Sequence, residues 1–290
     1  MIRIPGFQDL SPRAVAVRAG KDFVNHDMPT YAAALAFRAL LALFPFAIFL
    51  LALLGSIGLT DFFDWLVGQA QTALPQDAAS VVGRVTREIR NQATGGLLSF
   101  GIVTAIWVAS TAVRSLMTAL NAAYDVEESR PVWKRYPLSV AYTLGLAAML
   151  IAAAALMLVG PQAVQWVAGH VGLGGLVVAL WAWLRWPAAV LLLLTAVAVA
   201  YYVAPDVDQP FRFVTPGSAL AVAAWVGASL GFSSYVGTFG SYGATYGSLG
   251  GVVVLLLYLF ISAAMLLLGA EVNAAIYQLA GQLHGDHGAD

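Results

Sequence analysis

The sequence contains no cysteine and few charged residues. Cysteine is absent from all 290 positions, and Asp, Glu, Lys and Arg together make up 10% of the chain, whereas soluble domains average about 25% charged residues. Without cysteine, the chain can form no disulfide, thiolate metal site or cysteine nucleophile. The scarcity of charge, together with 60% hydrophobic residues and a mean hydropathy of +0.81, indicates a membrane protein.

The charges that remain give no basic field. The chain has 14 basic and 15 acidic residues, and the basic ones are spread along it, so we expect no binding of nucleic acid. It contains no Walker loop and no H-E-x-x-H pair, and His284 and His287 stand in a glycine-flanked tail that is poorly suited to holding a metal. We therefore expect no metal, no cofactor and no enzymatic activity.

Apolar runs long enough to cross a bilayer recur along the chain. A spanning helix needs about 20 residues, and residues 138–159 contain no Asp, Glu, Lys, Arg or His. We expect an all-α membrane protein with a single membrane domain over residues 1–280, followed by a flexible cytoplasmic tail at 281–290. Its six transmembrane helices are predicted at residues 31–59, 97–121, 138–159, 185–204, 215–236 and 247–270.

Several further helices are predicted outside the bilayer. Ser11 followed by Pro12 is typical of a helix start, and Ala14, Val17 and Val24 recur at helical spacing opposite basic residues, which indicates an interfacial helix. Residues 60–96 carry two apolar stripes and predict two amphipathic helices in the first outer connection. Residues 172–184 predict a short interfacial helix that ends just before Arg185.

The distribution of Lys and Arg predicts the orientation, because basic residues accumulate in cytoplasmic loops. Placing the N-terminus inside puts eight basic residues in inner segments (Arg3, Arg13, Arg18, Lys21, Arg130, Lys134, Arg135 and Arg212) and three in outer ones (Arg84, Arg87 and Arg90). Both termini are therefore expected in the cytoplasm.

Four segments, in this order and spacing, resemble the YihY/BrkB family of bacterial inner-membrane proteins. They are "YAAALAFRALLALFPF" from Tyr31, "WVASTAVRSLMTALNAAYDVEESR" from Trp107, "VTPGSALAVAAW" from Val214 and "YGSLGGVVVLLLYLFISAAMLLLGAEVNAA" from Tyr246. The resemblance covers about residues 10 to 280. It implies six spans in the cytoplasmic membrane, and the chain departs from the family pattern at Arg38, where an aromatic residue is expected.

What the resemblance implies about activity is limited. Members of the family are described as uncharacterised or virulence-associated, some have been proposed to move lipids or other solutes, and the family has also carried a ribonuclease label. A ribonuclease would need acidic metal ligands, or a histidine acid and base beside a basic groove, and the sequence shows neither pattern.

Polar residues inside or at the ends of the predicted spans are the candidate substrate or coupling residues. Arg38 and Arg114 lie in the cytoplasmic halves of their helices, and three polar residues stand near helix ends on that side: Asn121, Glu271 and Asn273. An intramembrane charge is by default a functional hypothesis. Two readings stay open: Glu271 pairs with one of the arginines in a polar layer, or both arginines extend toward the headgroups.

Other residues have predicted structural roles. Pro45 removes a backbone hydrogen bond inside the first span, so it is a candidate hinge or a passive kink. Gly227 and Gly231 form a G-x-x-x-G pair, typical of close helix packing. The segment "GASLG" around Ser229 matches a hydrolase motif, but that motif needs a strand and a sharp turn, and here it falls inside a predicted helix. Tyr246, in a glycine- and tyrosine-rich outer turn, is a further substrate candidate.

These features favour a membrane transporter or exporter of a lipid-like or other amphipathic substrate, in contact with membrane lipids. The alternative is a non-transporting envelope protein that binds a partner through residues 60–96. With no ATP-binding motif, uphill transport would depend on an ion gradient or a partner, and Arg38, Arg114 and Glu271 are the candidates for coupling. The oligomeric state is open, with a homo-oligomer among the alternatives.

Overall fold

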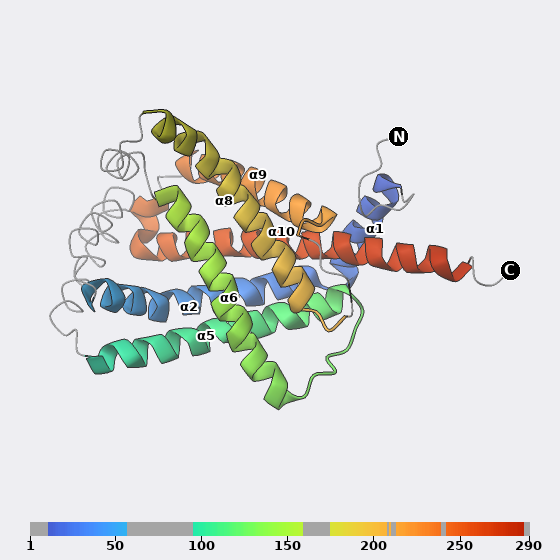
Figure 1. Cartoon of the computed structure of the whole chain (residues 1–290), viewed down its shortest axis with the longest axis horizontal. Helices are drawn as coiled ribbons and strands as arrows, with labels where there is room; N and C mark the ends of the chain where they lie inside the picture. The colour runs from blue at the N-terminus through green and yellow to red at the C-terminus, as the bar shows by residue number, and fades with distance from the viewer. Residues whose placement is uncertain are drawn as a thin grey trace. The chain divides into compact units, whose positions relative to one another are not determined.

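A computed structural model describes residues 11–56, 95–158, 175–207, 209, 213–238 and 242–286. These residues form seven α-helices and no β-strand (Figure 1). The helices are α1 (Pro12–Asn25), α2 (Met28–Ser56), α5 (Gly95–Ala123), α6 (Val132–Leu158), α8 (Gly175–Val203), α9 (Pro216–Thr238) and α10 (Tyr242–Asp286).

Most of these helices can cross a membrane. Five contain a stretch of sufficient length and hydropathy: Gly101–Ala123, Val132–Ala153, Ala179–Val203, Pro216–Val236 and Gly250–Leu279. A sixth apolar stretch, Met28–Leu43, is shorter and belongs to α2. The all-α, multi-pass membrane fold with about six spans is therefore confirmed.

The chain divides into two compact units. Unit 1 comprises Met1–Met28, Met117–Ala224 and Met265–Asp290, and unit 2 comprises Pro29–Leu116 and Trp225–Ala264. Helices α5, α9 and α10 each contribute residues to both units. Within unit 1, α6 and α8 pack against each other. The single membrane domain over residues 1–280 stays a prediction.

Helices α8 and α10 extend furthest beyond their predicted spans. α8 begins at Gly175 and runs without a break to Val203, so the separate interfacial helix expected at residues 172–184 is wrong for its described part. The physical reason is that the residues from Leu176 to Leu184 are all apolar and include neither glycine nor proline to end a helix. α10 continues to Asp286, so its residues 281–286 are helical where a flexible tail was predicted.

The buried face of α1 differs from the predicted one. The helix begins at Pro12 as expected, although the Ser11 side chain makes no capping hydrogen bond. Val15 and Ala19 are buried and pack against Val272 and Ala275 of α10, whereas Val17 is 51% exposed. Residues four apart share one helix face, so α1 packs through the face that carries Val15 and Ala19. An interfacial position of α1 stays a prediction.

Some predicted features lie outside the described residues or are not tested by them. The two amphipathic helices expected at residues 60–96 fall almost entirely outside. Pro45 is inside α2, as predicted, and its role as a hinge stays a prediction. A second proline, Pro187, lies in the interior of α8.

Candidate functional site

The predicted site residues fall into two groups, one in each unit, and each group is described by itself. Glu271 belongs to unit 1 and is 1% exposed. Its Oε1 lies 2.9 Å from Nδ1 of His26, in the turn between α1 and α2. Glu271 therefore has an ion-pair partner in His26, and its predicted pairing with Arg38 or Arg114, which belong to unit 2, stays a prediction.

His26 faces a carboxylate on each side of its ring. Nε2 lies 3.2 Å from Oδ1 of Asp125, the second residue after the end of α5, which has a left-handed conformation with φ 55°. Only the protonated imidazole has a donor on both nitrogens. The arrangement thus favours an imidazolium held between Glu271 and Asp125.

The charges around His26 support this protonation state. Burial opposes the charged ring and is the largest single influence, but the hydrogen bond to Glu271 and the charges of Glu271, Asp125 and Asp22 raise the pKa of His26 above 6.5. His26 therefore binds its proton more tightly than a free histidine does.

A second set of contacts ties the same three elements together. Arg18 of α1 donates from Nη2 to Oε1 of Gln278 in α10 at 2.7 Å, and Gln278 donates from Nε2 to Oδ2 of Asp125 at 2.9 Å. Arg18 also pairs with Asp22, one turn along α1, at 3.4 Å. α1 is thus joined to the C-terminal part of α10 by both apolar packing and polar contacts.

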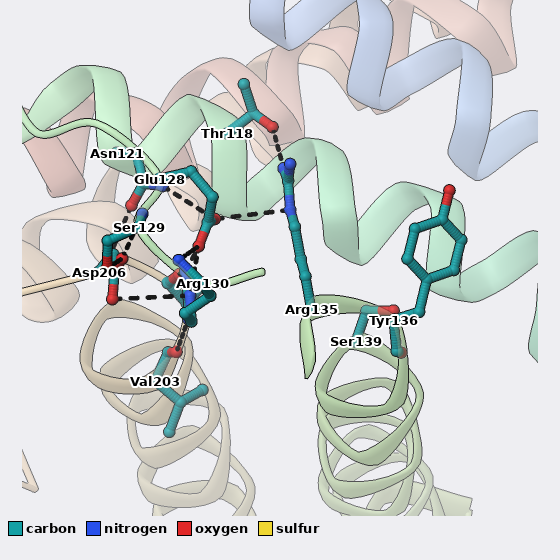
Figure 2. A network of polar contacts seen from close by, with 11 residues as sticks. Thr118, Asn121, Glu128, Ser129, Arg130, Arg135, Tyr136, Ser139, Val203 and Asp206 are labelled. Carbon is teal, nitrogen blue, oxygen red and sulfur yellow. Dashed lines mark hydrogen bonds and ion pairs between the residues drawn. The ribbon is translucent and has the colours of Figure 1, made fainter. Parts of the chain in front are cut away.

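Asn121 lies in a polar network that joins two connections of unit 1 (Figure 2). Its side chain is 4% exposed, donates to Glu128 at 3.1 Å and accepts the backbone N–H of Asp206 at 2.7 Å. Asp206 also accepts the backbone N–H and the hydroxyl of Ser129, at 2.7 and 2.5 Å. These contacts use one N–H and one oxygen lone pair of the Asn121 side chain to hold the two connections together, and its role toward a substrate stays a prediction.

Arg130 occupies the centre of that network (Figure 2). Its guanidinium pairs with Glu128 and with Asp206, and it donates to the carbonyls of Ala204 and Val203 at 2.8 and 3.5 Å. The last carbonyls of a helix have no partner within it, and a cation is favourable beside them. Arg130 therefore stabilises the C-terminal end of α8.

Asn273 performs a comparable task at the start of α9. Its Oδ1 accepts the backbone N–H of Gly217 at 2.8 Å, and its Nδ2 donates to Oγ1 of Thr215 at 2.9 Å. Thr215 in turn accepts the backbone N–H of Ser218. Asn273 therefore satisfies one of the unpaired N–H groups at a helix N-terminus.

Asn273 stands beside a very close crossing of α9 and α10. A Cβ atom at Gly217 would lie 2.0 Å from the carbonyl oxygen of Gly269, and one at Gly269 would lie 2.4 Å from the carbonyl oxygen of Gly217. By contrast, a Cβ at Gly227 or Gly231 would meet nothing within 4 Å. A close approach of α9 and α10 is therefore found at Gly217 and Gly269, and the packing role predicted for Gly227 and Gly231 stays a prediction.

Unit 2 contains the two intramembrane arginines. Arg38 of α2 donates from Nη1 to the carbonyl oxygen of Thr111 in α5 at 2.9 Å. Arg114 of α5 donates to Oγ of Ser110, one turn earlier, at 2.9 Å, and its guanidinium carbon lies 5.8 Å from the ring centre of Trp107. Both guanidinium groups therefore bind within the same turn of α5.

The contacts between α9 and α10 in unit 2 concern neutral groups. Trp225 donates to Oγ of Ser262 at 3.0 Å, and Oγ of Ser229 lies 3.2 Å from the hydroxyl of Tyr258. Ser229 is inside α9, which confirms that its G-x-S-x-G pattern is helical and lacks the strand and turn of a hydrolase. The side chain of Tyr246 lies outside the described residues.

Sequence reasoning missed two features of these sites. His26 was passed over, although the segment "NHDMP" interrupts two helical patterns and so places a histidine at a turn. The Gly217–Gly269 crossing has no local motif, since the two glycines are on different helices. Among the described residues, no group of three His, Cys, Asp or Glu side chains is arranged to hold a metal ion.

Comparisons with known proteins identify several relatives of this chain. The ribonuclease-like protein YfkH of Bacillus subtilis is 36% identical over 256 residues, which cover 88% of this chain and 92% of that protein. A UPF0761 membrane protein of Stenotrophomonas maltophilia is 26% identical over 91% of this chain, and one of Xanthomonas campestris is 27% identical over 88%. The chain spans 62% and 58% of the length of these two longer relatives.

No solved structure gives a significant match to the chain. The family model described as "Virulence factor BrkB" matches residues 19–289. The match takes in all seven helices except the first turns of α1, and it includes every polar contact described above except those of Arg18. This multi-pass membrane protein therefore belongs to the BrkB family.

Proposed function

We propose that the protein is a transporter or exporter that moves a lipid-like or other amphipathic substrate across the bacterial inner membrane, with both termini in the cytoplasm. The observation that carries the proposal is the position of Arg38 and Arg114, two cations on apolar helices that bind within one turn of α5. A charge exposed to hydrocarbon costs at least about 2.5 kcal/mol. The presence of two such charges in one unit supports a transport pathway that accommodates a polar group of the substrate.

The contacts of His26 with Glu271 and Asp125 suit a role in energy coupling. Glu271 is buried within a candidate span and contacts a histidine that also faces Asp125. Buried carboxylate and histidine pairs are typical of proton relays in membrane transporters. We propose Glu271 and His26 as the groups that exchange a proton, so that an ion gradient drives any uphill movement.

The other predicted site residues support this path indirectly. Asn121 and Asn273 bind backbone and side-chain groups of their own unit, which favours a positioning role for both. We further propose that the protein has no enzymatic activity and binds no nucleic acid, on the basis of its near-neutral charge and the helical setting of Ser229. The ribonuclease-like wording belongs to the name of the Bacillus relative.

The test is a flux assay with purified protein in liposomes. Wild type, Arg38→Gln, Glu271→Gln and Lys21→Gln would be compared on fluorescent phospholipids and small amphipathic solutes, with and without a proton gradient. Lys21 is exposed on α1 and makes no described contact, so its variant is the matched control. We expect flux in wild type and in the control, and loss of at least about tenfold in both other variants; equal flux in all four would overturn the assignment of these residues.

A further inference from the structure

Helix α8 carries one charged side chain, Arg185, in an otherwise apolar sequence. From residue 138 to residue 205 the chain contains no Asp, Glu or Lys, and Arg185 is the only arginine in this stretch. Helix α6, which packs against α8 within unit 1, contains no Asp or Glu either. Neither of these two packed helices therefore supplies a carboxylate to neutralise the charge of Arg185.

The guanidinium group of Arg185 also lacks a hydrogen-bond acceptor. Its Nε is buried and has no hydrogen-bond partner among the described residues. The contact that the structure shows is with the ring of Trp186, whose centre lies 5.7 Å from the guanidinium carbon. An aromatic ring attracts a cation but does not replace the acceptors that five N–H donors require. Since Arg185 is partly exposed, a ligand that brings acceptor oxygens can reach its side chain.

Arg130, in the same unit, shows what a satisfied guanidinium looks like in this protein. It pairs with the carboxylates of Glu128 and Asp206 and donates to two carbonyls at the C-terminal end of α8. Arg185, on the same helix, has no comparable contact among the described residues. The acceptor that Arg185 lacks must therefore come from outside the described part of the chain.

The position of Arg185 along α8 indicates where that acceptor lies. Eighteen positions separate Arg185 from Val203, which corresponds to about 27 Å at a rise of 1.5 Å per residue. The hydrocarbon core of a bilayer is about 30 Å thick. Charged groups such as those around Arg130 are costly inside this core, so their network belongs at one membrane surface. Arg185 then lies close to the opposite surface, at the depth of the headgroups.

Large apolar side chains surround Arg185 on α8 and are exposed. Trp183 is 82% exposed, Trp186 is 60% exposed and Leu184 is 53% exposed. The two tryptophans are three positions apart, so they lie on one side of the helix. Tryptophan is enriched at the level of lipid headgroups, where its apolar ring meets the start of the acyl chains. This surface thus combines a cation with apolar rings at the membrane boundary.

We propose that Arg185, together with Trp183 and Trp186, binds the phosphate headgroup of an anionic phospholipid in the leaflet at the N-terminal end of α8. Arginine binds phosphate oxygens through paired N–H donors, and the exposed rings pack against the glycerol and the first acyl carbons. A zwitterionic headgroup suits the site less well, because its ammonium group finds no carboxylate on α6 or α8. The site is independent of the transport activity proposed above.

The test measures equilibrium binding of a defined lipid. Full-length protein in a non-ionic detergent is mixed with radiolabelled phosphatidylglycerol in mixed micelles, and bound lipid is counted against unlabelled phosphatidylglycerol, phosphatidylcholine or inorganic phosphate. The variants are Arg185→Gln, Arg185→Lys and Trp186→Leu. Lys134→Gln is the matched control, because Lys134 also lies over a tryptophan ring, Trp133, at 5.1 Å, but is exposed at the start of α6.

We expect Arg185→Gln to weaken binding of phosphatidylglycerol by about tenfold or more, since it removes the charge-assisted hydrogen bonds to the phosphate. Arg185→Lys keeps the charge but loses the paired donors, so its loss should be smaller. Trp186→Leu should weaken binding by a few fold, because it removes the ring that holds the guanidinium. Lys134→Gln should bind as wild type does, and phosphatidylcholine should compete poorly.

Several results would overturn the site. They are wild-type affinity in Arg185→Gln, an equal loss in Lys134→Gln, phosphatidylcholine competing as well as phosphatidylglycerol, and inorganic phosphate competing at the same affinity as the lipid. An equal loss in the lysine variant would mean general attraction of anions, and competition by phosphate would mean a site for the free ion. A melting curve of each variant separates folding from binding, and Arg185→Lys and Trp186→Leu supply the answer if Arg185→Gln does not fold.

Discussion

Nδ1 of His26 lies 2.9 Å from Oε1 of Glu271, across 245 positions of sequence. The contact joins the turn after α1 to the C-terminal half of α10, and Asp125, in the connection after α5, lies on the other side of the ring. Three elements of unit 1 therefore meet at one imidazole ring, which makes this ring the best place to test how the unit is stabilised.

Replacing His26 with leucine should destabilise the protein by about 3 kcal/mol, because Glu271 is left buried without its partner. The double variant His26→Leu, Glu271→Met should recover at least half of this loss, since it removes the uncompensated carboxylate as well. Unfolding in detergent, followed by circular dichroism, measures both, and Lys21→Leu serves as the exposed control. A double variant less stable than His26→Leu would show that the pair is not the stabilising element.

The raised pKa of His26 predicts how stability depends on pH. A group whose pKa is higher in the folded than in the unfolded state contributes its full stabilisation below the unfolded value, here 6.5, and loses it as the pH rises through the folded value. Stability should therefore fall as the pH is raised from about 6 toward the alkaline side. Melting temperatures across this range should show the decline in wild type, and a decline of the same size in His26→Gln would assign it to other groups.

The α9–α10 crossing predicts opposite results for two glycine substitutions. Gly269→Ala places a Cβ 2.4 Å from a backbone oxygen, so it should cost about 3 kcal/mol or prevent folding. Gly231→Ala has open space and a helical setting, so it should be neutral or stabilise by up to about 1 kcal/mol. Thermal unfolding of both variants measures the two changes in stability. Equal changes would contradict the close approach of α9 and α10 at Gly217 and Gly269.

Asp206 should contribute to stability in the opposite pH range from His26. The hydroxyl of Ser129 is the main cause that lowers the pKa of Asp206, with the Ser129 N–H and the charge of Arg130 adding to it against the effect of burial. This stabilisation is present above pH 3.8 and is lost as the pH falls through the folded value. Asp206→Asn and Ser129→Ala should both make the stability of the protein less sensitive to acid. If neither variant changes this sensitivity, the contacts of Asp206 do not contribute to stability.

Much of the fold could be predicted because it follows from hydrophobicity alone. Apolar runs of sufficient length must form helices in a membrane, so six predicted spans correspond to the six long helices from α2 to α10. Their ends were less predictable. No residue between Leu176 and Leu184 would interrupt a helix. The sequence therefore gives no reason for a helix to begin at Arg185, where the prediction placed the start of this span.

The candidate site was harder to predict, because its contacts join residues far apart in the sequence. Arg38 and Arg114 could be identified from charge in an apolar run, and Glu271 likewise. The partner of Glu271 could not, since His26 is in a turn outside the spans and only folding brings it to α10. Similarly, the spacing of Gly227 and Gly231 describes one helix face and contains no information on which face meets a neighbour.

The network around Arg130 also implies an order of events during synthesis of the chain. Glu128 precedes Arg130 by two positions, so this ion pair can form as soon as both residues have been made. The carbonyls of Val203 and Ala204, which Arg130 also binds, are 73 and 74 positions downstream. Glu128 can therefore keep the guanidinium neutralised while α6 and α8 are being translated and inserted, and the loop closes on the end of α8 only after that helix has emerged.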